Sequence, residues 1–205
     1  MRNGRSGTVS PAVLTATMPA PELRDVRTVF LDRDGTVNVK AAEGEYIRSP
    51  AELVLLPGAA RALAALNAAG LRTVLVTNQR WLSEPTAAPA DFAAVHDRLI
   101  RLLADRGARV DAAYHCPHPA NSCDCRKPGP GMLLRAAAEH DVDLAASVMI
   151  GDSDVDMVAG RAAGTKTILI RPGARQAVAE ADFVVDDLAA AVELILNAGK
   201  TPPAG

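Results

Sequence analysis

Apolar and polar positions follow two different periods in turn along the middle of this chain. Short apolar runs, each typical of a buried strand, occupy residues 28–32, 72–77, 111–115, 147–151, 166–170 and 183–185. Longer stretches with apolar positions at helical spacing, several of them closed by a glycine, occupy residues 58–69, 91–106, 130–140, 154–163 and 187–198. Strands that alternate with helices predict an α/β fold, a doubly wound parallel sheet with helices on both faces and right-handed crossovers.

Length and composition fit one domain with a core of small aliphatic side chains. The chain has 205 residues, of which 49% are apolar but only 3% aromatic, so Ala, Leu and Val must fill the core. A net charge of −2 gives no electrostatic reason to expect nucleic acid or a membrane surface as a partner. No window approaches the roughly 20 apolar residues of a membrane span.

The two ends of the chain differ in composition from its middle. Residues 1–25 are rich in polar and small residues and contain no sustained apolar run of the kind that a signal peptide needs. We therefore expect a flexible N-terminal tail over 1–25, a single domain over 26–199 and a second tail over 200–205. We also expect a cytoplasmic monomer.

The segment from Val29 to Thr36 carries the strongest chemical signal. Its apolar run ends at Asp32, and Asp34 and Gly35 follow in a turn, so two carboxylates lie where a strand stops. Parallel α/β sheets bind ligands beyond the carboxyl ends of their strands, and two carboxylates so close favour a hard cation such as Mg²⁺. The alternative is a simple acidic turn, since Asp and Gly favour turns for local reasons.

Three further segments place polar side chains at strand ends or helix starts. Thr77 and Asn78 end an apolar strand, where their side chains could hold a phosphoryl oxygen or cap a turn. Lys127 precedes a predicted helix start, a good phosphate site, although the alternative is a solvated basic turn. Asp152 ends another strand, where a metal ligand would be wanted, while Asp156 also fits a helix-capping arrangement.

All three cysteines lie within ten residues, in the pattern C-x-H-x₄-C-x-C. Cys116, His118, Cys123 and Cys125 offer three thiols and one imidazole, a complete tetrahedral set for structural Zn²⁺. The alternatives are unreactive thiols or a disulfide between the last two cysteines, which would be strained and would leave one cysteine over. The adjacent His115 points the other way along an extended chain, so we expect it to pack rather than to bind metal.

The order D-x-D-G-T, T-N, K-P and G-D-x-x-x-D resembles the motifs of the haloacid dehalogenase (HAD) superfamily of phosphotransferases. The resemblance covers about residues 28–185, most of the chain. It implies that Asp32 attacks phosphorus and forms an aspartyl-phosphate. It also implies that Asp34 protonates the leaving oxygen and then deprotonates the water that cleaves this intermediate.

The same resemblance implies a magnesium site. Mg²⁺ would be held by the side chains of Asp32 and Asp152 and by the backbone carbonyl of Asp34. Mg²⁺ and Lys127 together would neutralise the charge that spreads over the phosphoryl oxygens during transfer. Asp156 would brace Lys127 or a metal-bound water.

The cysteine-rich loop resembles one branch of the superfamily, which holds the D-glycero-D-manno-heptose 1,7-bisphosphate phosphatases and the histidinol-phosphate phosphatases. This implies hydrolysis of a small phosphorylated metabolite, and we expect the heptose bisphosphate. The expected substrate contacts are Thr77, Asn78, Arg80 and Arg126. Arg80, directly after T-N-Q, favours an anionic sugar, and Trp81 could stack on a sugar face. The alternative for Arg80 is a solvated loop charge.

Other features keep histidinol phosphate as the alternative substrate. Residues 80–85 replace the small, glycine-containing turn that heptose members usually carry, and the spacer inside the cysteine-rich loop is nearer the histidinol-phosphate version. Glu43 and Glu45 with Tyr46 follow the nucleophile strand and would suit the amine and imidazole of that substrate.

A hypothesis from a different class is a non-catalytic, zinc-stapled module that binds phosphate. Replacement of Asp32 or Asp34 would favour it, and both are present. A phosphomutase or phosphonatase would need a sizeable cap insertion, and residues 36–57 are too few for a helical cap domain.

Overall fold

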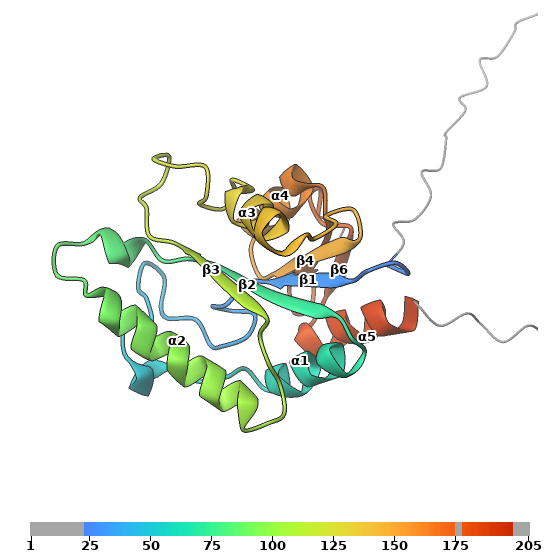
Figure 1. Cartoon of the computed structure of the whole chain (residues 1–205), viewed down its shortest axis with the longest axis horizontal. Coiled ribbons are helices and arrows are strands. Elements are labelled where there is room, and N and C mark those ends of the chain that lie inside the picture. The colour runs from blue at the N-terminus through green and yellow to red at the C-terminus, as the bar shows by residue number, and fades with distance from the viewer. Residues whose placement is uncertain (1–22, 175–177, 199–205) are drawn as a thin grey trace, which may run out of the picture.

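The computed structural model describes residues 23–174 and 178–198 and shows the predicted α/β fold (Figure 1). Six parallel strands form one sheet in the order β3-β2-β1-β4-β5-β6. The strands are β1 (Thr28–Leu31), β2 (Arg72–Asn78), β3 (Ala112–Cys116), β4 (Ser147–Gly151), β5 (Lys166–Ile170) and β6 (Phe183–Val185). The helices are α1 (Ala59–Ala68), α2 (Pro89–Ala104), α3 (Gly131–His140), α4 (Asp154–Ala163) and α5 (Leu188–Ala198), with the 3₁₀ helices η1 (Pro50–Glu52) and η2 (Arg80–Ser83). The predicted strands and helices are confirmed, each to within two residues at its ends.

The two expected tails lie almost wholly outside the described residues. Only residues 23–25 of the first tail are described, and none of residues 200–205. Within the described ranges, no helix is long and apolar enough to cross a membrane. Between β1 and α1 the only helix is η1, so no cap domain interrupts the described fold there.

The sheet separates two layers of apolar side chains. On one face α1, α2 and α5 cover a core that includes Val29 and Leu31 of β1 (Figure 1). On the other face α3 and α4 cover a second core that includes Phe30. Neighbouring residues of β1 thus point to opposite faces, and all three are fully buried, as expected for a central strand with helices on both sides.

The strand order reverses beside β1, which decides where a ligand can bind. The chain runs from β1 through β2 to β3 and then returns to β4 on the other side of β1. In register, Leu31 of β1 lies beside Leu75 of β2 and Ile150 of β4. The residues that follow these strands, such as Asp32 and Asp152, therefore meet at one edge, where doubly wound sheets bind their ligands.

Candidate active site and metal sites

A cavity of about 500 Å³ opens at this edge of the sheet. Its wall is the loop of residues 40–47 between β1 and α1. Its floor consists of side chains at the carboxyl ends of the strands or in the segments that follow them: Asp32, Asp34, Thr77, Asn78, Lys127, Asp152, Ser153 and Asp156. The structure thus places the side chains predicted for catalysis and for magnesium around one cavity.

A buried ammonium group connects three parts of the chain on the cavity floor. Lys127 Nζ lies 2.6 Å from Asp32 Oδ1 and 2.6 Å from Asp156 Oδ1, and donates to the Val76 carbonyl at 2.8 Å. Burial acts to lower the pKa of Lys127, but the carboxylates of Asp156 and Asp32 outweigh it and raise that pKa. Burial raises the pKa of Asp32 to about 7, although Lys127 opposes the shift. Lys127 therefore stays a cation on the floor of the cavity.

Two side chains hold this arrangement in place. Asn78 donates to the carbonyl of Lys127 at 2.9 Å and accepts from its N–H at 3.1 Å, so the Asn78 amide is engaged with the protein backbone. The Asp156 carboxylate accepts from the backbone N–H of Ser153 at 3.2 Å and from its hydroxyl at 2.8 Å. Asp156 therefore makes a capping contact at the start of α4 and also pairs with Lys127.

Three carboxylates on the floor could hold a divalent cation. One oxygen each of Asp32, Asp152 and Asp156 lie within 4.8 Å of one another. Asp152 also pairs with Nζ of Lys40, a largely exposed residue of the wall, at 2.5 Å. The side chain of Asp34 does not belong to this group, and its predicted role in metal binding uses the backbone carbonyl. Hard oxygen donors of this kind fit Mg²⁺.

Asp34 is held by donors that the sequence analysis missed. Its carboxylate accepts hydrogen bonds from the Arg33 guanidinium at 2.8 Å, the Asn38 amide at 2.9 Å and the Gln79 amide at 2.8 Å. These three donors are at most 1% exposed. Arg33 and Gln79 stand inside the D-x-D-G-T and T-N-Q segments, which could have drawn attention to them. Asn38 and Lys40 reach the site only through the course of the following loop.

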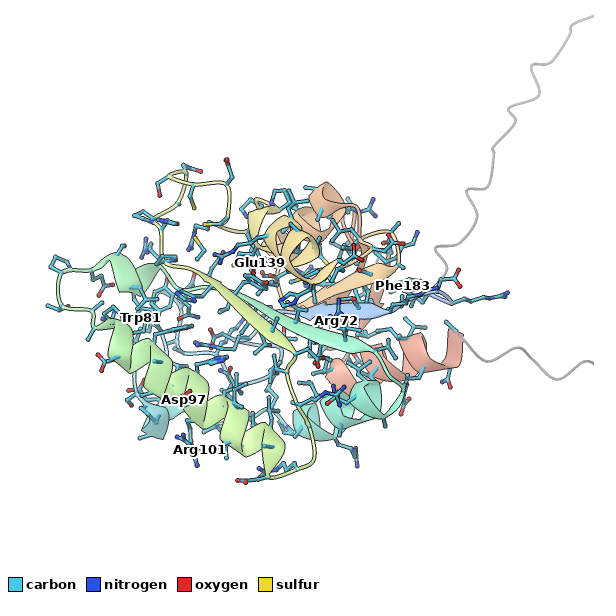
Figure 2. The ribbon with its side chains drawn as sticks, viewed as in Figure 1. Arg72, Trp81, Asp97, Arg101, Glu139 and Phe183 are labelled. Carbon is cyan, nitrogen blue, oxygen red and sulfur yellow. The ribbon has the colours of Figure 1, made fainter. Side chains whose placement is uncertain are left out.

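The two residues after T-N-Q that were predicted to contact the substrate, Arg80 and Trp81, do not line the cavity. Helix η2 turns Trp81 inward, where it is 1% exposed and donates through its indole N–H to Gln79 Oε1 at 2.8 Å (Figure 2). The prediction that Trp81 stacks on a sugar is therefore wrong.

Arg80, at the start of η2, and Arg126 are not among the residues that line the cavity. Arg126 instead lines a separate pocket beside the cysteine-rich loop.

The loop between β3 and α3 gathers the four residues predicted to bind zinc. Ligand atoms of Cys116, His118, Cys123 and Cys125 lie within 4.8 Å of one another. The cysteines are free, with sulfurs 3.2–3.5 Å apart, longer than the roughly 2.05 Å of a disulfide. Burial acts to raise the pKa of the Cys123 thiol, but hydrogen bonds, foremost with Cys125, lower it to about 7. Three sulfur donors and one imidazole gathered in this way suit tetrahedral Zn²⁺.

Comparisons with known proteins agree with this geometry. A family model described as "HAD-hyrolase-like" matches residues 124–191. A D-glycero-beta-D-manno-heptose-1,7-bisphosphate 7-phosphatase of Bordetella bronchiseptica is 39% identical over 179 residues, which cover 84% of this chain and 99% of the relative. The chain belongs to this heptose-bisphosphate phosphatase family. The resemblance to the HAD superfamily that the motif order indicated is confirmed.

Other members of the heptose-bisphosphate phosphatase family give the same result. A D-glycero-D-manno-heptose-1,7-bisphosphate 7-phosphatase of Chlorobaculum tepidum is 38% identical over 189 residues, which cover 83% of this chain and 94% of the relative. The solved structure of the B. bronchiseptica enzyme, complexed with magnesium and phosphate, matches with a TM-score of 0.77. It is 39% identical and covers 84% of this chain and 99% of that one.

Replacing Gly35 with alanine should displace Asp152 and weaken cation binding. Gly35 has a φ of +92°, and a Cβ there would lie 2.6 Å from Cγ of Asp152. We expect the Mg²⁺ affinity, measured by calorimetric titration, to fall at least about tenfold, as it does when the support of a metal ligand is disturbed. Gly58→Ala is the control, because Gly58 has a φ of +78° with no atom within 4 Å of the added Cβ. Unchanged affinity in the Gly35 variant would contradict this arrangement.

Proposed function

We propose that this chain is a magnesium-dependent phosphatase that hydrolyses D-glycero-D-manno-heptose 1,7-bisphosphate to the monophosphate through an aspartyl-phosphate on Asp32. One observation carries the chemistry: Asp32 and the cation of Lys127 lie 2.6 Å apart on the floor of a cavity at the ligand-binding edge of the sheet. The relatives support the substrate, because they are named for this sugar bisphosphate and match this chain over 94–99% of their own length.

Each step of the reaction is assigned to side chains of the cavity floor. A carboxylate oxygen of Asp32 attacks phosphorus while the bond from phosphorus to the sugar oxygen breaks, and Asp34 gives its proton to that oxygen. Asp34 then takes a proton from the water that attacks the aspartyl-phosphate. This second step releases inorganic phosphate and restores the Asp32 carboxylate. Lys127 and Thr77 hold the phosphoryl oxygens in both steps.

The magnesium ligands of this proposal are the side chains of Asp32 and Asp152 and the carbonyl of Asp34. When bound there, Mg²⁺ supplies positive charge beside the phosphoryl oxygens. Among the described residues of the cavity lining, Lys40 is the only cation besides Lys127. We assign to Lys40 the second phosphate of the substrate, in place of Arg80 and Arg126. Its ammonium pairs with Asp152. A metal ion held by Asp152 would neutralise that carboxylate and leave the ammonium of Lys40 free to bind the second phosphate.

A second candidate substrate, histidinol phosphate, is favoured by the other charges of the wall. Glu43, Glu45 and Tyr46 line the cavity, and carboxylates suit an amine and an imidazole. The two candidates therefore depend on different side chains of the same loop, Lys40 for the bisphosphate and the two glutamates for histidinol phosphate.

Asp32→Asn should lower turnover by about 10³-fold or more, because the amide is a poor nucleophile, while the protein stays folded. The measurement is steady-state release of inorganic phosphate with saturating Mg²⁺. Asp154→Asn is the control, since Asp154 starts α4 and pairs with Arg171 at 2.8 Å outside the cavity lining. A near-normal rate in the Asp32 variant would refute the covalent mechanism. Inactive wild-type protein that still binds phosphate would favour the non-catalytic module.

The choice of substrate is tested by comparing kcat/KM for the heptose bisphosphate, its monophosphate and histidinol phosphate. We expect the bisphosphate to be the best substrate. Lys40→Met should reduce its preference over the monophosphate by about tenfold, because a charge-assisted contact is lost. Both assays use saturating Mg²⁺, so that a change in metal binding at Asp152, the partner of Lys40, does not alter the ratio. Glu43→Gln should leave that ratio unchanged. A wild-type preference for histidinol phosphate, reduced in Glu43→Gln, would establish the second candidate instead.

We further propose one structural Zn²⁺, held by Cys116, His118, Cys123 and Cys125. Elemental analysis of protein purified under reducing conditions without chelator should find about one zinc per chain. His118→Ala should lose the zinc and loosen the loop. His115→Ala should keep it, because the ring centroid of His115 lies 4.3 Å from that of Phe92 and His115 lies outside the ligand group. Zinc-free wild-type protein with reduced cysteines would contradict the proposal.

A further inference from the structure

The side chain of Gln79 lies between the active site and the interior of the protein. It is fully buried, and its Nε2 donates to Asp34 Oδ2 and to Thr77 Oγ1, each at 2.8 Å. Its Oε1 accepts from the indole N–H of Trp81, also at 2.8 Å. Gln79 therefore contacts two residues of the cavity floor and one residue of the core.

The hydrogen-bonding capacities of its partners allow Gln79 only one orientation. An indole N–H can only donate, so it requires the amide oxygen of Gln79 on the side of Trp81. The NH₂ group must then face Asp34 and Thr77, whose Oδ2 and Oγ1 accept its two hydrogen bonds. Without the indole N–H, the buried oxygen of Gln79 would lose its donor, and the orientation would no longer be fixed from the side of the core.

This orientation has a consequence for each of the two floor residues. The Thr77 hydroxyl accepts from Gln79, so its own hydrogen remains available for an oxygen in the cavity. Asp34 Oδ2 is held by Gln79 in addition to Arg33. A proton donor in a phosphoryl transfer must be held close to its productive position, because small displacements are costly in rate.

We infer that Trp81 and Gln79 are positioning residues that orient Asp34 and Thr77 for the reaction. Trp81 does so through its indole N–H, without contact with the cavity, in which it is not a lining residue. The inference rests on the proposed function, since it takes Asp34 as the group that protonates the leaving oxygen. Trp81, which follows T-N-Q, would thus influence proton transfer to the leaving oxygen by orienting Asp34 through Gln79.

The test uses two model substrates that differ in how much their leaving group needs a proton. Nitrophenolate leaves readily without one, whereas phenolate benefits from proton donation by Asp34. The measured quantity is the first-turnover rate with enzyme in excess, for p-nitrophenyl phosphate and for phenyl phosphate. A general loss of folded protein lowers both rates alike, but a displaced Asp34 lowers the phenyl phosphate rate more.

Two variants remove the connection at different points. Trp81→Phe removes the indole N–H but keeps an aromatic ring, and Gln79→Met keeps a side chain of similar length without hydrogen-bonding groups. In each we expect the ratio of the nitrophenyl rate to the phenyl rate to rise about tenfold. Gln79→Met also serves if Trp81→Phe fails to fold. Tyr114→Phe is the matched control, since it removes the hydrogen bond of another buried aromatic side chain, to Glu139 at 2.7 Å, outside the cavity lining, and should leave the ratio unchanged.

Asp34→Asn separates the failure of this inference from a failure of the proposed function. A raised ratio in Asp34→Asn with wild-type ratios in Trp81→Phe and Gln79→Met would overturn the inference and leave the function intact. A wild-type ratio in Asp34→Asn itself would show that Asp34 is not the proton donor, and both proposals would fall. Raised ratios in all three variants, with an unchanged Tyr114→Phe, are the expected result.

Discussion

The candidate active site depends on one buried group of charges, the ammonium of Lys127 between the carboxylates of Asp32 and Asp156. Removing one partner of a buried ion pair costs about 3–5 kcal/mol, because the remaining charge is left uncompensated. The three residues come from the end of β1, from the loop before α3 and from the first turn of α4. They meet because β1 and its neighbours in the parallel sheet end at the same edge, so the topology of the sheet supplies the geometry that the buried charges require.

Three glycines allow the backbone to pack closely around this group of charges and in the loop that carries Lys127. A Cβ at Gly151 would overlap the carboxylate of Asp156. At Gly129 and Gly131 it would lie 2.5 and 2.6 Å from the carbonyl oxygen of Asp124. These glycines let the cysteine-rich loop fold tightly before α3, and Lys127 lies inside that tight segment. The loop has little apolar core of its own, so its cysteine and histidine cluster and these close backbone contacts must define its shape.

Much of this fold could be predicted because local signals and tertiary requirements agree. Strands and helices follow from periodicity, and Asp32, Lys127 and Asp152 belong to motifs that mark strand ends or helix starts. The orientation of Trp81 could not be predicted, because the partner of its indole, Gln79, can be identified only once η2 is placed over the core. Lys40 was missed for a similar reason: it meets Asp152, which is 112 residues away, through a loop without a repeating pattern.

In the proposed function, chemistry and substrate choice use parts of the chain that differ in burial. Four of the floor side chains, those of Asp32, Thr77, Lys127 and Asp156, are buried and the others are half-buried, whereas Lys40, Glu43 and Glu45 of the wall are exposed. The wall is nevertheless connected to the core. Arg48, just beyond it, pairs with Glu84 at 2.8 and 3.0 Å and lies 5.5 Å from the ring centroid of Trp81. On the proposed function, changes in the exposed charges of this loop would alter the leaving group that is accepted while the floor keeps its geometry. Changes at Arg48 or Glu84 would reach the indole of Trp81 and, through Gln79, the carboxylate of Asp34, the proton donor of the proposed function.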